Sequence, residues 1–279
     1  MAYEIGTASS NYDLLTKIRT FLESTLPVGQ RWTMQREVTT GASREVVWQA
    51  PGLSGTESIC GGLSMYESIP SDVYNICVMA CIGTVPANSF STQPGISALL
   101  GVPLWNNAIP YWIIGNGQRV VVAVKIENVY QVFGLGKFFP YATPAQYPYP
   151  VIAFGALTNT AFTRYSDTTY VSGWKGSRAN FTMRTLGGTW ISPTIYAYST
   201  TKTFRNTVNA DATADGYYGL HPLVLMDSTN VYGELDGLYF ISGYNNASEN
   251  TLVVDGVTYI VFRDVYRTGF NDYIAMRLA

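Results

Sequence analysis

The chain has 279 residues, which is enough for one large or two ordinary domains and for a sizeable core without disulfides. Its net charge is −2 and its basic residues are scattered, so the sequence predicts neither a nucleic-acid-binding surface nor a polybasic membrane-binding patch. No stretch approaches the roughly 20 consecutive apolar residues of a membrane-spanning helix. The N-terminal residues lack the basic and apolar segments of a signal peptide, and we expect the protein to fold in a cytoplasm.

The composition is poor in charge and rich in aromatic residues. Charged residues make up 13% of the chain, against about 25% in ordinary soluble domains, and aromatic residues make up 14%. Tyrosine and tryptophan combine a large apolar body with a polar atom, which suits surfaces that are buried against a partner. The composition therefore favours a subunit of a larger assembly. The alternative is a tyrosine-rich all-β monomer, since aromatic residues also favour strands.

One amphipathic helix is predicted near the N-terminus, over residues 12–23. Its apolar residues recur with the spacing of one helical face: Leu14, Leu15, Ile18, Phe21 and Leu22. Ser10 or Asn11 can cap the first turn, and Pro27 and Gly29 lie just beyond the last turn.

Antiparallel strand pairs are predicted over most of the chain that follows. They cover residues 31–38 with 44–48, residues 58–66 with 73–82, and residues 109–114 with 119–126. The last pair flanks Asn116-Gly117, and this dipeptide is the strongest short-range signal of a β-hairpin. Residues 85–101 are rich in Pro, Gly and Ser, which marks either a long loop or a domain boundary.

Residues 138–150 form an unusual segment that contains four prolines. Each proline lacks a backbone donor, so the segment cannot be a central strand of a sheet. We expect an extended, polyproline-like segment from which tyrosines project. Two alternatives are open: a rigid loop strapped across its own domain, or an arm that reaches a neighbouring subunit.

The C-terminal half is also predicted to be β-rich. Its expected strands are residues 180–185, 189–198, 223–226, 237–242, 251–260, 261–266 and 273–278, and Asp255-Gly256 indicates a second hairpin. Many short strands predict a mainly β fold, an antiparallel sandwich or barrel, which follows the single amphipathic helix. We expect an α+β domain over residues 1–95 and a β-rich domain over residues 96–279, or two β-rich subdomains.

No histidine or cysteine pattern in the sequence predicts catalysis or a metal site. His221 is the single histidine, and no nucleophile motif accompanies it. Cys60, Cys77 and Cys81 fit buried free thiols better than a disulfide framework or a zinc site. Residues 209–216 resemble the start of a calcium-binding loop but lack its acidic twelfth residue.

Acidic pairs of the glycosidase type need only meet in the fold, so inspection leaves them open. Glu234 and Asp236 lie on the same side of a single strand, where a turn or a subunit contact explains them as well. The sequence offers no recognisable active site. We expect a protein that is not an enzyme, with no catalytic residue, no cofactor and no metal ion.

Four segments and the opening helix carry a family resemblance. The segments are residues 104–112 (LWNNAIPYW), 141–150 (YATPAQYPYP), 234–243 (ELDGLYFISG) and 263–272 (RDVYRTGFND), and the helix is followed by Arg31-Trp32. In these features the chain resembles uncharacterised virion proteins encoded in the structural modules of tailed bacteriophages and prophages. The resemblance implies a virion protein of the neck or collar, the tail or the baseplate, made in the host bacterial cytoplasm. It carries over no catalytic residue.

The leading prediction is a virion structural component that packs against other virion proteins as one copy of a symmetric homo-oligomer. The candidate contact residues lie on either side of the Asn116-Gly117 hairpin: Trp105, Tyr111, Trp112, Phe138, Phe139, Tyr141, Tyr147 and Tyr149. The alternative is a receptor- or glycan-binding module of the adsorption apparatus, whose aromatic rings would stack on host surface sugars. A virion glycan hydrolase is a third hypothesis, which needs an acid pair in a cleft.

Overall fold

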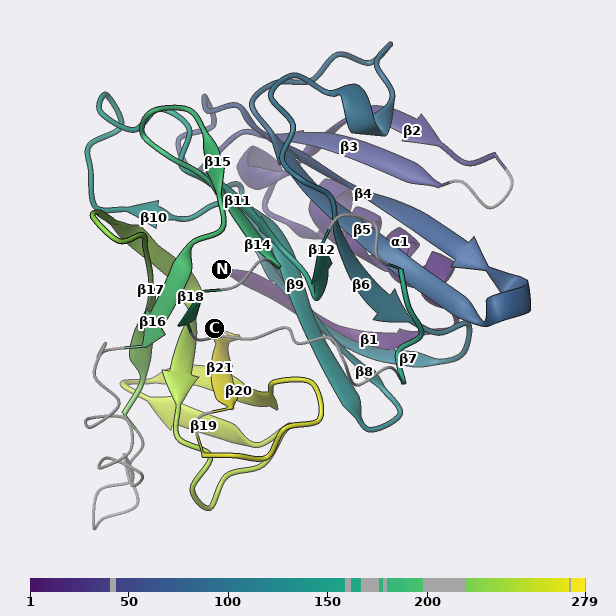
Figure 1. The fold of residues 1–279 in the computed structure, drawn as a ribbon, viewed down its shortest axis with the longest axis vertical. Coiled ribbons are helices and arrows are strands. Elements are labelled where there is room, and N and C mark those ends of the chain that lie inside the picture. Colours follow the sequence, from purple (N-terminus) through teal and green to yellow (C-terminus); the bar gives the residue numbers. More distant parts are fainter. Residues whose placement is uncertain are drawn as a thin grey trace.

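The predicted mainly antiparallel β fold with one N-terminal helix is confirmed. The structure is a computed structural model, and it describes residues 1–40, 44–158, 162–166, 176–177, 180–197, 219–270 and 272–278. Three sheets stack in layers, with a seven-stranded sheet in the middle (Figure 1). The architecture is therefore a layered sandwich of open sheets rather than a closed barrel.

The central sheet has the strand order β1-β7-β8-β9-β11-β14-β15. Its strands are β1 (Ala2–Ala8), β7 (Ile109–Gly115), β8 (Arg119–Ile126), β9 (Val129–Lys137), β11 (Val151–Phe154), β14 (Phe181–Arg184) and β15 (Trp190–Ile191). Successive side chains of a strand point to opposite faces. On β8, Val120 and Val122 face one hydrophobic core while Val121 and Ala123 face another. Both faces of β8 are thus buried, which explains why this strand is apolar almost throughout.

A six-stranded sheet covers one face of the central sheet and completes the first core. Its order is β12-β6-β5-β4-β3-β2, with β2 (Thr33–Val38), β3 (Glu45–Ala50), β4 (Ile59–Ser68), β5 (Val73–Cys81), β6 (Leu100–Leu104) and β12 (Leu157–Thr158). The loop between β5 and β6 contains the short 3-10 turn Phe90–Thr92. Phe90 packs against Cys60 and Met79 on the outer face of this sheet, so the loop acts as a cover.

A third sheet covers the other face of the central sheet and forms the second core. Its order is β13-β16-β17-β18-β21-β20-β19, and β10 (Phe139–Pro140) pairs with β18. The strands are β13 (Gly176–Ser177), β16 (Thr194–Ala197), β17 (His221–Met226), β18 (Val231–Ile241), β19 (Thr251–Val254), β20 (Val257–Arg263) and β21 (Tyr273–Arg277). Trp112 of the central sheet meets Phe262 of this sheet edge to face, with ring centroids 5.0 Å apart.

The predicted helix is α1 (Asn11–Thr20), and it continues as a π-helical turn over Phe21–Thr25. The Ser10 hydroxyl accepts a hydrogen bond from the Asp13 N–H at 3.2 Å, which caps the first turn. Leu14 and Ile18 are fully buried in the first core, where α1 contacts β1 and β7 on one side and β4 and β5 on the other. Two further short 3-10 turns cover Val28–Gln30 and Ile69–Ser71.

The predicted hairpins are present. Asn116 closes the turn between β7 and β8, because its side-chain oxygen accepts from the Gln118 N–H at 2.8 Å and its own N–H donates to the Arg119 carbonyl at 3.0 Å. Asp255 and Gly256 join β19 to β20 with positive φ angles of 52° and 77°, a conformation that favours Asp and Gly. The pairs β2 with β3 and β4 with β5 also match their predicted ranges closely.

Seven strands were not predicted: the longer strands β1, β6, β9 and β11, and the two-residue strands β10, β12 and β13. In β9 the apolar pattern is interrupted by Gly134, whose bare Cα lets the ring of Phe154 and the carbonyl of Val120 approach closely. The strand expected over residues 189–198 is two strands, β15 and β16, with Pro193 between them.

The predicted division between residues 1–95 and 96–279 cuts through two sheets. The N-terminal strand β1 pairs with β7 in the central sheet, and β5 pairs with β6 in the six-stranded sheet. Backbone hydrogen bonds therefore join the two predicted domains along whole strands. Residues 85–99 lie in a long loop between β5 and β6 of one packed unit and not at a domain boundary, and residues 100 and 101 belong to β6.

Candidate functional site

Residues 138–150, here called the strap, lie across the chain's own fold. The Phe138 N–H donates to the Pro150 carbonyl at 3.0 Å and closes the strap at its base. Phe139 pairs with Glu234 of β18, and the Tyr141 N–H donates to the Tyr232 carbonyl at 3.0 Å. Of the two alternatives for this segment, the described contacts are those of a rigid loop strapped across its own domain.

Four of the eight predicted contact residues lie in the core, and for these the prediction is wrong. They are Tyr111, Trp112, Phe138 and Tyr147, and none is more than 6% exposed. Tyr111 and Trp112 belong to β7, which is covered on both faces. Phe138 and Tyr147 pack edge to face against each other, with ring centroids 5.5 Å apart. These side chains stabilise the fold and are not available to a partner.

The other four predicted contact residues reach the surface to different degrees. Trp105 is half-buried, donates from its indole N–H to the Ala108 carbonyl at 3.1 Å, and meets Tyr165 edge to face. Phe139, Tyr141 and Tyr149 of the strap are 54%, 53% and 41% exposed. The strap therefore places three aromatic rings at the surface, on a backbone that hydrogen bonds hold in place.

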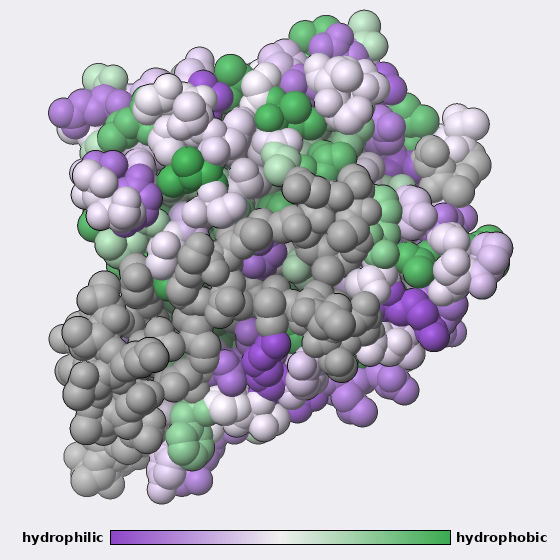
Figure 2. Space-filling view, viewed as in Figure 1, coloured by the Kyte–Doolittle hydropathy of each residue, from purple (hydrophilic) through white to green (hydrophobic). Residues whose placement is uncertain are grey.

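The surface around them is mixed in polarity. On the face shown in Figure 2, apolar residues occur as small separate patches between hydrophilic ones. The upper-left region of this view, where Figure 1 places β10, follows the same pattern. Protein–protein interfaces often have this character, with aromatic residues in the contact and polar groups around its rim.

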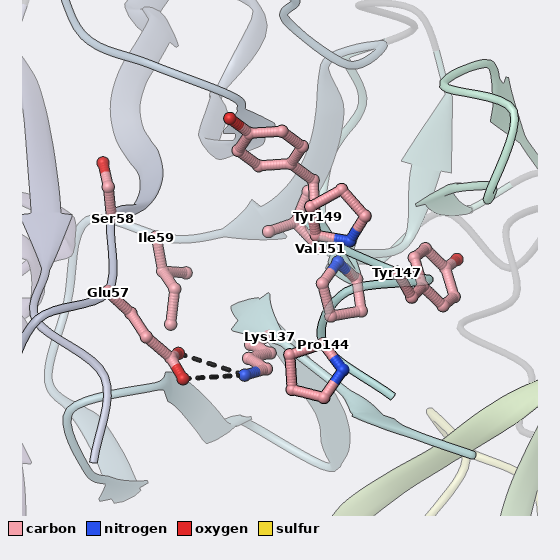
Figure 3. Close-up of a pocket in the computed structure, with 10 residues that line it drawn as sticks. Glu57, Ser58, Ile59, Lys137, Pro144, Tyr147, Tyr149 and Val151 are labelled. Atoms are coloured by element: carbon pink, nitrogen blue, oxygen red, sulfur yellow. Dashed lines mark hydrogen bonds and ion pairs between the residues drawn. The ribbon is translucent and has the colours of Figure 1, made fainter. Parts of the chain in front are cut away.

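A pocket of about 260 Å³ lies between the strap and the segment that leads into β4 (Figure 3). The Lys137 ammonium lies 2.9 Å and 3.1 Å from the two carboxylate oxygens of Glu57, and this ion pair forms one wall. Figure 3 shows the ring of Tyr149 on the opposite side of the pocket, with Pro144 beside the ion pair. The pocket thus combines a charged pair with an aromatic ring and the faces of prolines.

A second, more polar hollow of about 390 Å³ adjoins the first, because Glu57 lines both. Its other lining residues include Gln35 and Gln49, on the paired strands β2 and β3, and Thr56. Together the two hollows offer amide, hydroxyl, carboxylate and ammonium groups beside a tyrosine ring. Such groups can donate and accept hydrogen bonds with a polyhydroxylated ligand while the ring stacks on its apolar face.

Glu234 and Asp236 each have a structural partner. The Glu234 carboxylate accepts from the Tyr141 hydroxyl at 3.0 Å. Asp236 pairs with Arg119, a buried residue of β8, and so joins the central sheet to β18. Burial lowers the pKa of the Arg119 guanidinium, and the charge of Asp236 acts against this shift. These contacts account for both acids without a catalytic role.

The other residues that the sequence analysis considered for catalysis or metal binding are the histidine, the three cysteines and residues 209–216. His221 begins β17 and faces Phe240 of β18, with ring centroids 6.2 Å apart. Cys60 and Cys81 are buried free thiols that face each other across β4 and β5, and Cys77 is buried as well. Residues 209–216 lie outside the described residues. Among the residues that the structure does describe, no group of three His, Cys, Asp or Glu side chains could hold a metal ion.

The pocket residues Glu57 and Lys137 were missed in the sequence because they are 80 positions apart and meet only through the fold. No local pattern marks either of them. The tyrosines of the strap were found because four prolines nearby made an extended segment predictable.

Comparison with other proteins gives no family for the chain. Within the described part of the chain no helix is long and apolar enough to span a membrane. No model of a protein family matches the sequence, and a search of curated proteins found no match.

Proposed function

We propose that this protein is a structural subunit of a tailed-phage virion and that it acts by packing against other virion proteins. The family resemblance of residues 104–112, 141–150, 234–243 and 263–272 supports the virion assignment. The protein would be made in the host cytoplasm and incorporated into the neck, tail or baseplate. In this proposal the chain contributes contact surface and no catalysis.

The strap carries the proposal, because it presents large rings on a fixed backbone. Phe139 and Tyr141 lie edge to face with ring centroids 6.4 Å apart, and both are more than half exposed. The Tyr141 hydroxyl is held by Glu234 at 3.0 Å, so little side-chain freedom remains to be lost when a partner covers it. Rigid aromatic residues with a polar atom are the groups that most often dominate binding energy at interfaces.

The test is capture of the other structural proteins of the phage that encodes this chain. The variant Phe139→Ser/Tyr141→Ser should lose at least about 90% of the captured material, since interface hot spots are worth about 2 kcal/mol or more. Phe270→Ser is the matched control, because Phe270 is 45% exposed and lies outside the strap. Equal capture by the wild type, the double variant and the control would refute the proposal.

A second candidate function is glycan binding, and the pocket beneath the strap favours it. The Glu57–Lys137 pair and the Tyr149 ring face the same hollow, and the amides of Gln35 and Gln49 adjoin it. A glycan array should then show binding that Tyr149→Ala abolishes. Tyr244→Ala is the control. Tyr244 is also 41% exposed, but it lies in a loop of the third sheet and does not line the pocket. Binding that survives Tyr149→Ala, or no binding at all, would rule this candidate out.

A further inference from the structure

The strand β1 forms an open edge of the central sheet. It runs for seven residues, pairs with β7 without a register shift, and has no strand of the described residues on its other side. Within the part of the chain that the structure describes, no backbone group is bonded to this outer edge. An unpaired edge of this length is a template for another strand.

The hydrogen bond that closes the β7–β8 turn shows which residues of β1 point their backbone N–H and C=O groups away from β7. In an antiparallel pair, only every second residue exchanges hydrogen bonds with its neighbour across the ladder. The Asn116 N–H donates to the Arg119 carbonyl, so on β7 Trp112 and Ile114 turn toward β8. Tyr111, Ile113 and Gly115 must then turn toward β1.

The register of β1 with β7 completes the assignment. The β1 residues opposite those three are Gly6, Glu4 and Ala2, and their backbone groups are used within the sheet. The backbone N–H and C=O groups of Tyr3, Ile5 and Thr7 therefore point away from β7. Tyr3 and Thr7 lie two residues before and after Ile5, so the free hydrogen-bonding groups of the edge are arranged symmetrically about Ile5.

The side chains at this edge carry no charge. Tyr3 and Ile5 are 48% and 51% exposed, and Thr7 is exposed on the same face of the strand. Glu4 is the one charged residue of β1, and it lies on the other face, where the Tyr111 hydroxyl donates to it at 2.7 Å. The lysine, proline or bulge that usually protects an edge strand is absent from β1.

We propose that β1 pairs antiparallel with β1 of a second copy of this chain, around a two-fold axis at Ile5. Tyr3 then lies opposite Thr7 of the partner subunit, and Ile5 lies opposite Ile5 of the partner subunit. Every outward N–H and C=O of both strands gains a partner in this register, because the outward residues are symmetric about the axis. The central sheet becomes continuous through both copies.

A second copy suits this edge, because the symmetric register places Ile5 beside the partner's Ile5 and Tyr3 beside the partner's Thr7, which are uncharged pairs of the β-branched and aromatic type. Two features fix this register. A shift of the register by one residue would place the outward backbone groups of one strand opposite residues whose backbone groups already bond to β7. A shift by two residues would leave the backbone groups of an outward residue at the end of each strand without a partner. In the symmetric register Glu4 lies opposite Gly6 of the partner subunit, so the two carboxylates do not oppose each other directly.

The first test is the mass of the full-length protein in solution, measured by size-exclusion chromatography with light scattering. The wild type should have twice the mass of the 30.7 kDa chain. Ile5→Lys brings two like charges together at the axis, where such a pair costs several kcal/mol, and should raise the dissociation constant by roughly 100-fold or more. Val253→Lys is the control, because Val253 is 68% exposed on β19, an edge strand of the third sheet, and this variant should stay dimeric.

A second variant and a second readout keep the inference testable if Ile5→Lys does not fold. Ile5→Pro removes an N–H that the protein's own sheet does not use, so the pairing of β1 with β7 should remain while the dimer is lost. In the wild type the amides of Tyr3, Ile5 and Thr7 should exchange slowly with solvent, and Ile5→Pro should make Tyr3 and Thr7 exchange fast. A monomeric wild type, or dimers of both Ile5 variants, would overturn the inference. Neither result bears on the contacts proposed for the strap.

Discussion

The strap gives a sharp comparison, because Tyr147 and Tyr149 are close neighbours in the sequence but differ in burial. Tyr147 is 2% exposed and packs on Phe138 and Tyr232, while Tyr149 is 41% exposed. A buried aromatic ring removes roughly 200 Å² from water, which at about 25 cal/mol per Å² is worth about 5 kcal/mol. Tyr147→Ala should therefore lower the free energy of unfolding by about 3–5 kcal/mol, the usual range for an aromatic residue replaced by alanine.

Two further substitutions serve as comparisons: Tyr147→Phe keeps the buried ring and removes its hydroxyl group, and Tyr149→Ala removes an exposed ring. Tyr147→Phe removes only the hydrogen bond to the Arg184 carbonyl, which should cost about 1–2 kcal/mol. Tyr149→Ala should cost less than about 1 kcal/mol, since its ring is 41% exposed and its contact with the Arg184 guanidinium, at 5.8 Å, is a weak one.

Urea unfolding followed by fluorescence and circular dichroism measures all three variants, and the slope of stability against urea should stay constant. Equally small losses for Tyr147→Ala and Tyr149→Ala would refute the account of the strap. That result would mean that the strap is not anchored in the fold and that its buried aromatic residues are free to meet a partner.

The remaining predictions concern buried charge, pH and thiol chemistry. Asp236→Ala should cost about 2–3 kcal/mol in urea unfolding, because it leaves the Arg119 guanidinium buried without its partner, and no loss would contradict the role of this pair. Burial raises the pKa of Tyr12 from 10.0 to about 12, so the unfolded chain releases this proton first as pH rises. Stability should hold below about pH 10 and fall between about pH 10 and 12, and Tyr12→Phe should make the fall shallower. Hydrogen bonding to Cys81 lowers the pKa of Cys60, yet Cys60 is 1% exposed. Both thiols should react with a water-soluble disulfide reagent only at the rate of unfolding, and fast labelling of the native protein would contradict their burial.

Local patterns were sufficient to predict many elements of the fold. The spacing of apolar residues predicted α1, and the dipeptides at Asn116 and Asp255 predicted two hairpins, because these signals act within a few residues. β9 was missed because Gly134 interrupts its apolar pattern. The reason for a glycine at this position is the ring of Phe154, which packs against it only in the folded sheet. The order of the sheets, with β1 beside β7, rests on contacts between distant residues that no local pattern reports.

The site was harder to predict than the fold. Tyrosine suits a strand core and an exposed contact equally well, so the sequence could not separate Tyr111 and Tyr147 from Tyr141 and Tyr149. Which face of a strand is covered depends on the sheet stacked against it. The aromatic composition therefore predicted the residue type at the proposed contact surface, but only the packing shows which rings reach it.

The most direct test of the central claim is an electron cryo-microscopy map of the intact particle of the phage that encodes this chain. The account predicts several symmetric copies of the chain in the neck, tail or baseplate, with Phe139, Tyr141 and Tyr149 covered by a neighbouring virion protein. Absence of the chain from the particle, or a strap that faces solvent in every copy, would contradict it.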